Sequence, residues 1–209
     1  MTVDPNILVP TITSMLVITS PFDPVKILIF NRAISDPERS RTISAAKVAL
    51  YVIIILGGTA LIGRQFLELV GIDLNAFSIV GGLVILLMGF EMLYGGGTSK
   101  AQGDSKRQRG PESGDALFIP LTLPLIAGPG AMTTTITLAA RSEVANTVVI
   151  TLIAVGVVAL SAFVSYVWFG GAIAKLKPAV VAVLARIGGL LLATIGAQMM
   201  LNGFKLFFA

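Results

Sequence analysis

The sequence predicts an all-α membrane protein with six transmembrane helices, built as two inverted repeats of three helices, with the first and fourth helices broken at proline and glycine. Three observations lead to this fold class: an apolar composition, motifs that occur twice at one spacing, and an alternation of basic residues. Apolar residues make up 55% of the 209 residues and charged residues 12%, with a mean hydropathy of +0.91. Because a soluble domain carries about 25% charged residues, this chain needs lipid as its solvent.

The absence of two residue types narrows the chemistry. The sequence contains no cysteine and no histidine, which excludes disulfides, Cys/His zinc sites and histidine acid–base catalysis. It also lacks a phosphate-binding loop, so we do not expect ATP-driven pumping by this chain. We expect no enzymatic activity, no cofactor, no metal site and no nucleic-acid partner. The expected partners are a small-molecule substrate and the lipid bilayer, with homo-oligomerisation left open.

Six segments are long and apolar enough to cross a membrane, since a span needs about 20 mostly apolar residues. The fifth segment is the cleanest, because it contains no formal charge over its whole length. The second is the shortest, and it carries a lysine near its start. The expected spans are residues 7–30, 42–62, 72–94, 116–140, 147–173 and 178–208.

Basic residues are distributed unevenly between the connecting loops. The loops after the first, third and fifth expected spans carry several Lys and Arg residues, whereas the other two loops carry a single Arg each. The positive-inside rule therefore places the odd-numbered loops in the cytoplasm and both termini outside. With three spans per half, the repeats 1–95 and 116–209 have opposite orientations, and residues 96–115 form a flexible basic cytoplasmic linker between them.

A paired-glycine motif occurs once in each half of the chain. Gly81-Gly82 recurs as Gly188-Gly189, 107 residues later, within a similar apolar context. Small residues let two helices approach closely in a membrane. We therefore expect these four glycines to serve helix packing and not ligand binding.

A second motif repeats at nearly the same spacing. Ser20-Pro21 interrupts the first apolar segment, and Gly128-Pro129-Gly130 interrupts the fourth, 108 residues later. Proline lacks a backbone N–H and clashes with the carbonyl one turn back, so each motif should break its helix. Backbone groups freed by a break cannot face lipid and must face protein or a wet cavity. Matched breaks in two repeats are typical of a transporter whose substrate site lies between them at mid-membrane.

The break residues are therefore the candidate substrate-binding residues. A new helix N-terminus at each break attracts an anionic group such as a substrate carboxylate. The threonines after the second break can reach a ligand or bond to the freed backbone, and both roles stay open. The predicted substrate-binding residues are Ser20, Pro21, Asp23, Gly128, Pro129, Gly130, Thr133 and Thr134.

Three charged residues lie within the expected spans and are candidates for proton or ion coupling: Asp23, Lys26 and Glu91. Asp23 and Lys26 are three residues apart, so they share a face and can pair if the chain after Pro21 is helical. Asp23 either accepts a proton, holds a substrate ammonium or forms an internal ion pair with Lys26. Glu91 either relays protons or is an interfacial carboxylate at the end of its span. Tyr166 and Trp168 fit aromatic anchors at the membrane interface.

One stretch of the chain resembles a known family. The run Pro-Leu-Ile-Ala-Gly-Pro-Gly-Ala-Met-Thr-Thr at 124–134 resembles the signature of the MarC family of bacterial inner-membrane proteins, and Ser20-Pro21 resembles that family's first-half Asn-Pro-x-Gly element. The resemblance covers essentially the whole chain and implies a multi-pass protein of the bacterial inner membrane. The family is similar to the LysE superfamily of exporters, and some members are described as transporters of small neutral amino acids. Here Ser20, Asp23 and Lys26 replace the family's usual Asn, Gly and Pro, which puts an acid and a base into the first break.

The leading functional hypothesis is a secondary transporter, acting as exporter or facilitator of a small amino acid or similar metabolite. The repeat, the breaks and the orientation all favour it. The alternatives are an exporter of divalent metal or other cations, and a membrane scaffold subunit that transports nothing. Two carboxylates within the spans are a thin ligand set for a hard metal ion, which makes the metal exporter the weaker hypothesis.

Overall fold

The computed structural model of the chain describes residues 5–33, 41–94, 126–140, 147–173 and 176–208, and every regular element in these ranges is helical. The predicted all-α class is therefore confirmed for this part of the chain. In the first half the helices are α1 (Pro5–Thr19), α2 (Pro24–Ala33), α3 (Arg41–Val70) and α4 (Leu74–Leu93). The second half contains α6 (Pro129–Ala140), α7 (Thr147–Val164), the π-helical turn η2 (Ser165–Phe169), α8 (Gly170–Ile173) and α9 (Pro178–Phe207).

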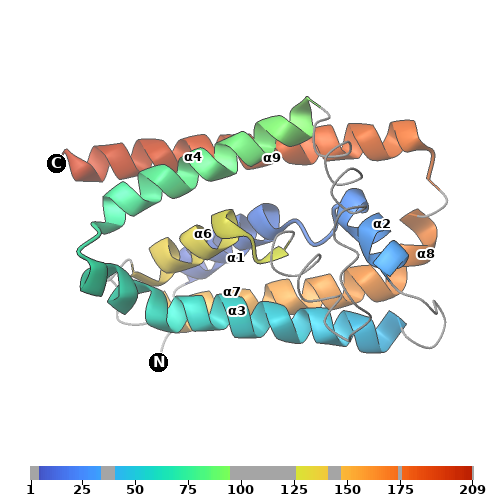
Figure 1. Cartoon of the computed structure of the whole chain (residues 1–209), viewed down its shortest axis with the longest axis horizontal. Helices are drawn as coiled ribbons and strands as arrows, with labels where there is room; N and C mark the ends of the chain where they lie inside the picture. Colours follow the sequence, from blue (N-terminus) through green and yellow to red (C-terminus); the bar gives the residue numbers. More distant parts are fainter. Residues whose placement is uncertain (1–4, 34–40, 95–125, 141–146, 174–175, 209) are drawn as a thin grey trace.

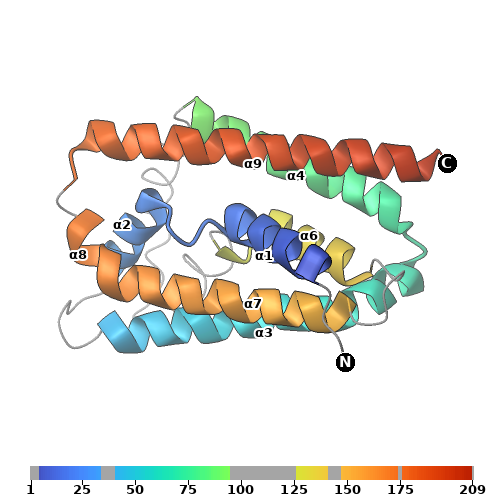
Figure 2. The same cartoon turned by 180° about the vertical axis from the view of Figure 1, so that it is seen from behind.

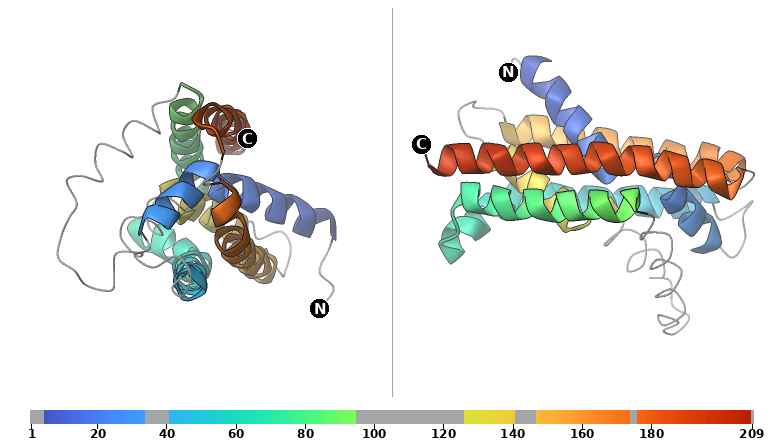
Figure 3. Two further views of the ribbon diagram at one scale, coloured as in Figure 1. Left: turned by 90° about the vertical axis from the view of Figure 1, so that its right-hand side faces the viewer. Right: turned by 90° about the horizontal axis from the view of Figure 1, so that it is seen from above.

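The helices form three layers (Figure 1). Helices α4 and α9 lie antiparallel and side by side in one outer layer, and α3 and α7 form the other (Figure 2). The shorter helices α1 and α6 lie between them: α1 contacts α7 and α9, while α6 contacts α3 and α4. Figure 3 shows this order end-on, with α2 at one end of the assembly beside α8. Both breaks therefore lie between the outer layers, whereas the N-terminal end of α1 projects away from the bundle (Figure 3).

Four helical stretches are long and apolar enough to cross a membrane: Arg41–Val70, Leu74–Leu93, Thr147–Phe169 and Pro178–Phe207. The pair Pro5–Thr19 and Pro24–Asn31 meets the same test as one span bent by 55°. The structure thus confirms a multi-pass helical protein and the break in the first span. Large apolar side chains such as Leu69, Ile62 and Leu201 face outward on these helices, as expected where the solvent is lipid.

The second expected span, 42–62, was too short. Helix α3 continues to Val70, and Arg64 is a helical residue whose Nε donates to Glu68 Oε1 at 2.8 Å. This exposed pair one turn apart stabilises the last turns of α3, so two charges that looked like a loop in the sequence belong to the helix. The helix ends at Gly71, which adopts a φ of 76° in the left-handed region that ends many helices.

The fourth expected span, 116–140, is described only from residue 126 onward. Within it α6 covers Pro129–Ala140, 12 residues, which is too short to cross a membrane by itself. Residues 116–125 and the expected linker 96–115 lie outside the described residues. The break before α6 is visible, because the helix starts at Pro129, where a missing N–H is no loss.

Glycines spaced by seven residues hold α4 against α9. A β-carbon on Gly82 would lie 2.7 Å from the Gly196 carbonyl oxygen, and one on Gly189 would lie 2.8 Å from the Gly89 carbonyl oxygen. Gly203 makes a third such contact, with Asn75. No side chain fits where backbones touch this closely. The seven-residue spacing of these glycines is visible in the sequence, although we predicted only the paired motifs.

The four glycines predicted to serve packing do not behave alike. Gly82 and Gly189 lie in the α4–α9 contact. Gly81 faces α6, and a β-carbon there would overlap the side chain of Thr133. Gly188 was expected to pack tightly as well, but a β-carbon added there would find the Met92 methyl carbon as its nearest neighbour at 3.7 Å, an ordinary contact. Space remains beside Gly188, and a cavity occupies it.

Candidate functional site

At the first break, two charged side chains form hydrogen bonds with the backbone at the ends of α1 and α2. Asp23 Oδ1 accepts the Val25 N–H at 2.8 Å, so Asp23 caps the N-terminus of α2. The Lys26 ammonium donates to the Thr19 carbonyl oxygen at 2.5 Å, at the C-terminus of α1. An acid at a helix N-terminus and a base at a C-terminus both match the helix dipole. The break is thus stabilised locally, although two helices end inside the bundle.

The turn between α1 and α2 requires an unusual backbone conformation. Ser20 has a φ of 41°, in the left-handed region that favours glycine. The Ser20 hydroxyl donates to the Val17 carbonyl, and the Ser20 N–H donates to the Leu16 carbonyl at 2.9 Å. Such strain persists only where the surrounding structure enforces it, and it gathers at functional sites.

A cavity of about 240 Å³, which we call the break cavity, lies beside this turn. Its wall includes Ser20 and Asp23 from the break, Met92 from the end of α4, and Ala185 and Gly188 from α9. The rest of the wall is apolar: Val17, Phe22, Pro24, Leu184 and Leu191. The cavity is therefore an apolar chamber with one carboxylate in its described wall.

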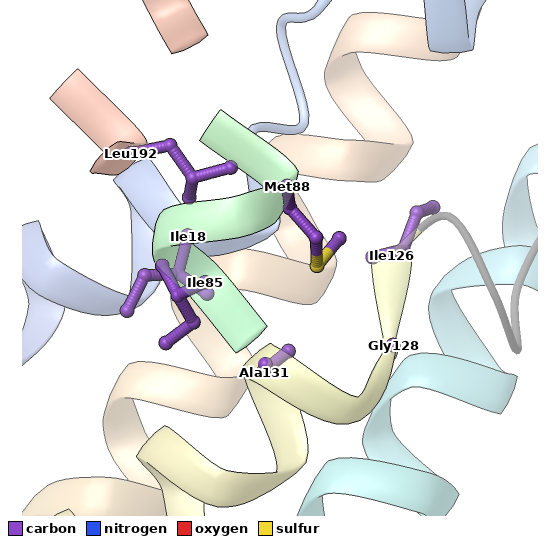
Figure 4. Close-up of a pocket in the computed structure, with 8 residues that line it drawn as sticks. Ile18, Ile85, Met88, Ile126, Gly128, Ala131 and Leu192 are labelled. Atoms are coloured by element: carbon purple, nitrogen blue, oxygen red, sulfur yellow. The ribbon is translucent and has the colours of Figure 1, made fainter. Parts of the chain in front are cut away.

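A second, narrower cavity, the central cavity, borders the other break. Its volume is about 10 Å³, the space of a single water molecule. Figure 4 shows side chains of α1, α4 and α9 converging there with residues 126–131. The lining residues are Ile18, Ile85, Met88, Ile126, Gly128, Gly130, Ala131 and Leu192.

The two cavities are neighbours along the same helices. Ile18 and Leu192 line the central cavity, while the residues just before them, Val17 and Leu191, line the break cavity. On α4, Met88 belongs to the central cavity and Met92, one turn later, to the break cavity. The two breaks therefore do not share one chamber: Ser20 and Asp23 line the larger cavity, and Gly128 and Gly130 line the smaller.

The remaining predicted substrate-binding residues line neither cavity. Pro21 is buried and Pro129 is exposed. Thr133 donates to the Pro129 carbonyl at 2.8 Å and Thr134 to the Gly130 carbonyl at 2.9 Å. Of the two roles left open for these threonines, the structure shows bonding to the backbone of the broken helix.

A buried tyrosine of η2 packs against α2. Tyr166 is 0% exposed and stacks on Phe30 with ring centroids 4.4 Å apart. Its hydroxyl has no hydrogen-bond partner among the described residues, and Tyr166 lines neither cavity. The expectation of an interfacial anchor was wrong for Tyr166, because the π-helical turn η2 directs it inward; Trp168 in the same turn is 76% exposed. A tyrosine in an apolar run carries no sequence signal of this direction.

Glu91 lies on the exposed face of α4 and lines neither cavity. Its proposed role in proton coupling therefore has no support from the geometry. Within the described ranges, Asp, Glu, His and Cys side chains form no group of three or more that could hold a metal ion. Asp23 is the charged group of the candidate site.

Comparison of the sequence with known proteins places the chain in a family. A family model described as "MarC family integral membrane protein" matches residues 6–208. The chain is 31% identical over 191 residues to a "UPF0056 membrane protein" of Pyrococcus abyssi, covering 91% of this chain and 90% of the relative. A relative from Pyrococcus horikoshii is 32% identical over 194 residues, with 92% of each chain covered. The "UPF0056 membrane protein YhcE" of Escherichia coli is 29% identical over 161 residues, with 75% of this chain and 73% of that protein covered.

No solved structure matches the chain. The family match and the apolar helices together confirm the predicted location, a multi-pass protein of the inner (plasma) membrane.

Proposed function

The chain belongs to the MarC family of integral membrane proteins, and from this premise we propose that it is a secondary transporter that exports or equilibrates a small amino acid or similar metabolite. The proposed binding site is the break cavity, with Asp23 in its wall. This refines the predicted site, which lay between the two breaks. The cavity is somewhat smaller than the chambers of about 300–1,000 Å³ that hold drug-sized ligands, which suits a small metabolite.

The proposal includes two inverted repeats, of which one is closely packed while the other borders an open cavity, and which alternate between these two states. The motif offsets of 107 and 108 residues support the presence of two repeats. The contact between α4 and α9 supports it as well. Gly82 touches Gly196 and Gly89 touches Gly189. Under the 107-residue offset Gly82 corresponds to Gly189, and Gly89 to Gly196. Each contact is thus the copy of the other, as a twofold axis between the helices requires.

One observation carries the proposal: two corresponding places in the repeats are packed differently. On one side, α6 presses against Gly81 so tightly that Thr133 fills the space of a side chain. On the other, Gly188 borders the break cavity and α2 does not fill the space. A transporter built from inverted repeats is closed on one side of its site and open on the other, and it alternates by rocking one part against the other.

A continuous face of α4 connects these two places. Gly81, Ile85, Met88 and Met92 recur every three or four residues, so they lie on one side of the helix. Along this face the contacts change from the tight Gly81–Thr133 contact, through the central cavity, to the break cavity. Gly81 and Met92 are about 16 Å apart along the helix axis. We infer that the substrate follows this face.

The basic residues give the break cavity a side in this proposal. Met92 lies near the end of α4, before the Lys/Arg-rich segment that follows it, and Gly188 lies in the first half of α9, whose N-cap is Lys177. The positive-inside rule assigns both of these helix ends to the cytoplasm. We propose that the break cavity lies on the cytoplasmic side of the site and the Gly81 contact on the outer side, as in a state that loads a substrate for export.

Flux in proteoliposomes tests the function. We expect saturable counterflow of labelled alanine, glycine or serine, or of a related metabolite, by the purified chain. No saturable flux of any small metabolite would refute the transporter.

The chain's lack of cysteine allows a test of alternation. Ala185 lines the break cavity, and Ser78, its counterpart at the 107-residue offset, is buried against α6 and lies 3.1 Å from the Thr137 hydroxyl. We expect a water-soluble thiol reagent to label Ala185→Cys rapidly and Ser78→Cys slowly. A transported substrate should slow the first and accelerate the second. Rates that never change in opposite directions would contradict alternation.

A further inference from the structure

The described wall of the break cavity contains charge of one sign. Asp23 is the only ionisable residue among the described residues that line it. Lys26 does not line the cavity, and its ammonium is directed to the Thr19 carbonyl at the end of α1. The Ser20 hydroxyl is likewise used by the Val17 carbonyl. A ligand in this cavity therefore faces one carboxylate and otherwise apolar groups.

Asp23 keeps capacity to bind a cation. One of its oxygens accepts the Val25 N–H, whereas a carboxylate offers about four acceptor positions. In the part of the chain that the structure describes, the one ion pair within salt-bridge distance is Arg64–Glu68, on another helix. Lys26 is near enough to Asp23 for an electrostatic interaction but not for a direct pair. The carboxylate is thus held in place by its cap and is open to a donor from the cavity.

An aromatic ring borders the same cavity. Phe22 lies in the cavity wall and is set edge-on against Phe169, with ring centroids 6.3 Å apart. The ring of Phe22 adds an aromatic group that attracts cations.

We propose that the break cavity binds a primary ammonium compound with a small apolar body, its ammonium held by the Asp23 carboxylate. This rests on the proposed function and names the substrate class of the same site. A primary ammonium has three donors, which suits the free acceptor positions of a carboxylate. The carboxylate of a zwitterionic amino acid would meet no cation in the described wall and would face Asp23. The cavity therefore favours an amine over the matching amino acid.

A matched ligand series tests this inference. Valine, 2-methylpropylamine and 3-methylbutanoate share one branched apolar body and carry both charges, only the ammonium, or only the carboxylate. We expect the amine to stabilise the detergent-purified full chain against heat, and to be transported in proteoliposomes, at about tenfold lower concentration than valine. The acid should have no effect.

Substitutions locate the binding. Asp23→Asn keeps an oxygen for the Val25 N–H, so the chain should fold, but it should weaken amine binding about tenfold or more. Glu91→Gln, which removes an exposed carboxylate outside the cavity, is the matched control and should leave amine binding unchanged. Tyr166→Phe removes a buried hydroxyl that does not line the cavity and should also leave amine binding unchanged.

Three results would overturn the inference: tighter binding of valine than of the amine, amine binding unaffected by Asp23→Asn, or equal loss in Glu91→Gln. Saturable valine transport without a preference for the amine would overturn the ammonium site alone and leave the transporter standing. Failure of every compound, together with the absence of any saturable flux of the amino acids, would refute both.

Discussion

The two breaks in the chain solve the same problem in different ways. At the first break, Asp23 and Lys26 satisfy the two helix ends with charged side chains, and Ser20 turns the chain through a left-handed conformation. At the second break, glycine and proline start α6 without any charged residue, and α6 packs directly on Gly81. Side-chain capping leaves room beside the first break, whereas close backbone packing fills the space at the second.

This difference shows how one repeated design can hold two states. A break that is stabilised by its own side chains does not depend on its neighbours and can stand away from α9 beside an open cavity. A break that lacks such side chains is stabilised by packing against a neighbouring helix. Three comparisons between variants, from the largest expected effect to the smallest, test whether the two places differ as described.

Substitution of the paired glycines should separate the two places most clearly. Gly81→Ala puts a methyl group into the Thr133 side chain, so we expect a loss of about 1–3 kcal/mol in the free energy of unfolding. Gly188→Ala meets only the mobile end of Met92 at 3.7 Å and should be neutral or stabilising by up to about 1 kcal/mol. Thermal unfolding in detergent measures both.

A double substitution controls for this interpretation. Gly81→Ala with Thr133→Ala should recover part of the loss, since the nearest clashing atom is the Thr133 methyl carbon. Equal effects at Gly81 and Gly188, or no recovery in the double variant, would show that the two places are not packed differently.

Removal of the acidic cap should have a smaller effect. Asp23→Ala takes away the acceptor of the Val25 N–H and should lower the free energy of unfolding by about 1 kcal/mol. Asp73→Ala at the start of α4, which loses the acceptor of two N–H groups, is a matched control of similar size. Asp23→Asn should be close to wild type in the same melting experiment. If Asp23→Ala were as stable as Asp23→Asn, the carboxylate would not be the cap of α2.

The smallest expected effect is on the free energy of unfolding when each of two serines is replaced by glycine, and we expect the two replacements to have effects of opposite sign. Ser20 and Ser161 both donate to the carbonyl three residues back, but only Ser20 has a positive φ. Ser20→Gly relieves strain and should stabilise by about 0.5–1 kcal/mol, whereas Ser161→Gly in the last turn of α7, where the helical path continues into η2, should destabilise by a similar amount. Melting temperatures that fall in both variants would argue against strain at Ser20.

The predictions from sequence were reliable where one physical signal dominates. Hydropathy located the apolar helices, and Pro21 marked the break in the first span, because a missing N–H ends a helix in any surroundings. The error at α3 arose where Arg64 and Glu68 resemble a loop but form an exposed helical pair. Of the predicted substrate-binding residues, Ser20, Asp23, Gly128 and Gly130 line cavities, and their role in binding stays a prediction.

The missed or misplaced residues share a cause. Tyr166, Gly188 and Thr133 each have local sequence that allows several environments, and the direction of a side chain around a helix decides which one occurs. A π-helical turn rotates Tyr166 inward, and packing between helices distant in the sequence determines which glycine is covered. Neither effect leaves a periodic signal in the chain.

By itself, the sequence determined that lipid is the solvent, that the elements are helices, and that proline interrupts the first span, because these follow from composition and from backbone chemistry at single positions. Only the tertiary structure decided that the two breaks border separate cavities, that α6 is pressed on Gly81 while space remains at Gly188, and that Tyr166 is buried. These features depend on the distances between packed helices. Such a distance is set by the packing of the whole bundle, so no single segment of the sequence determines it.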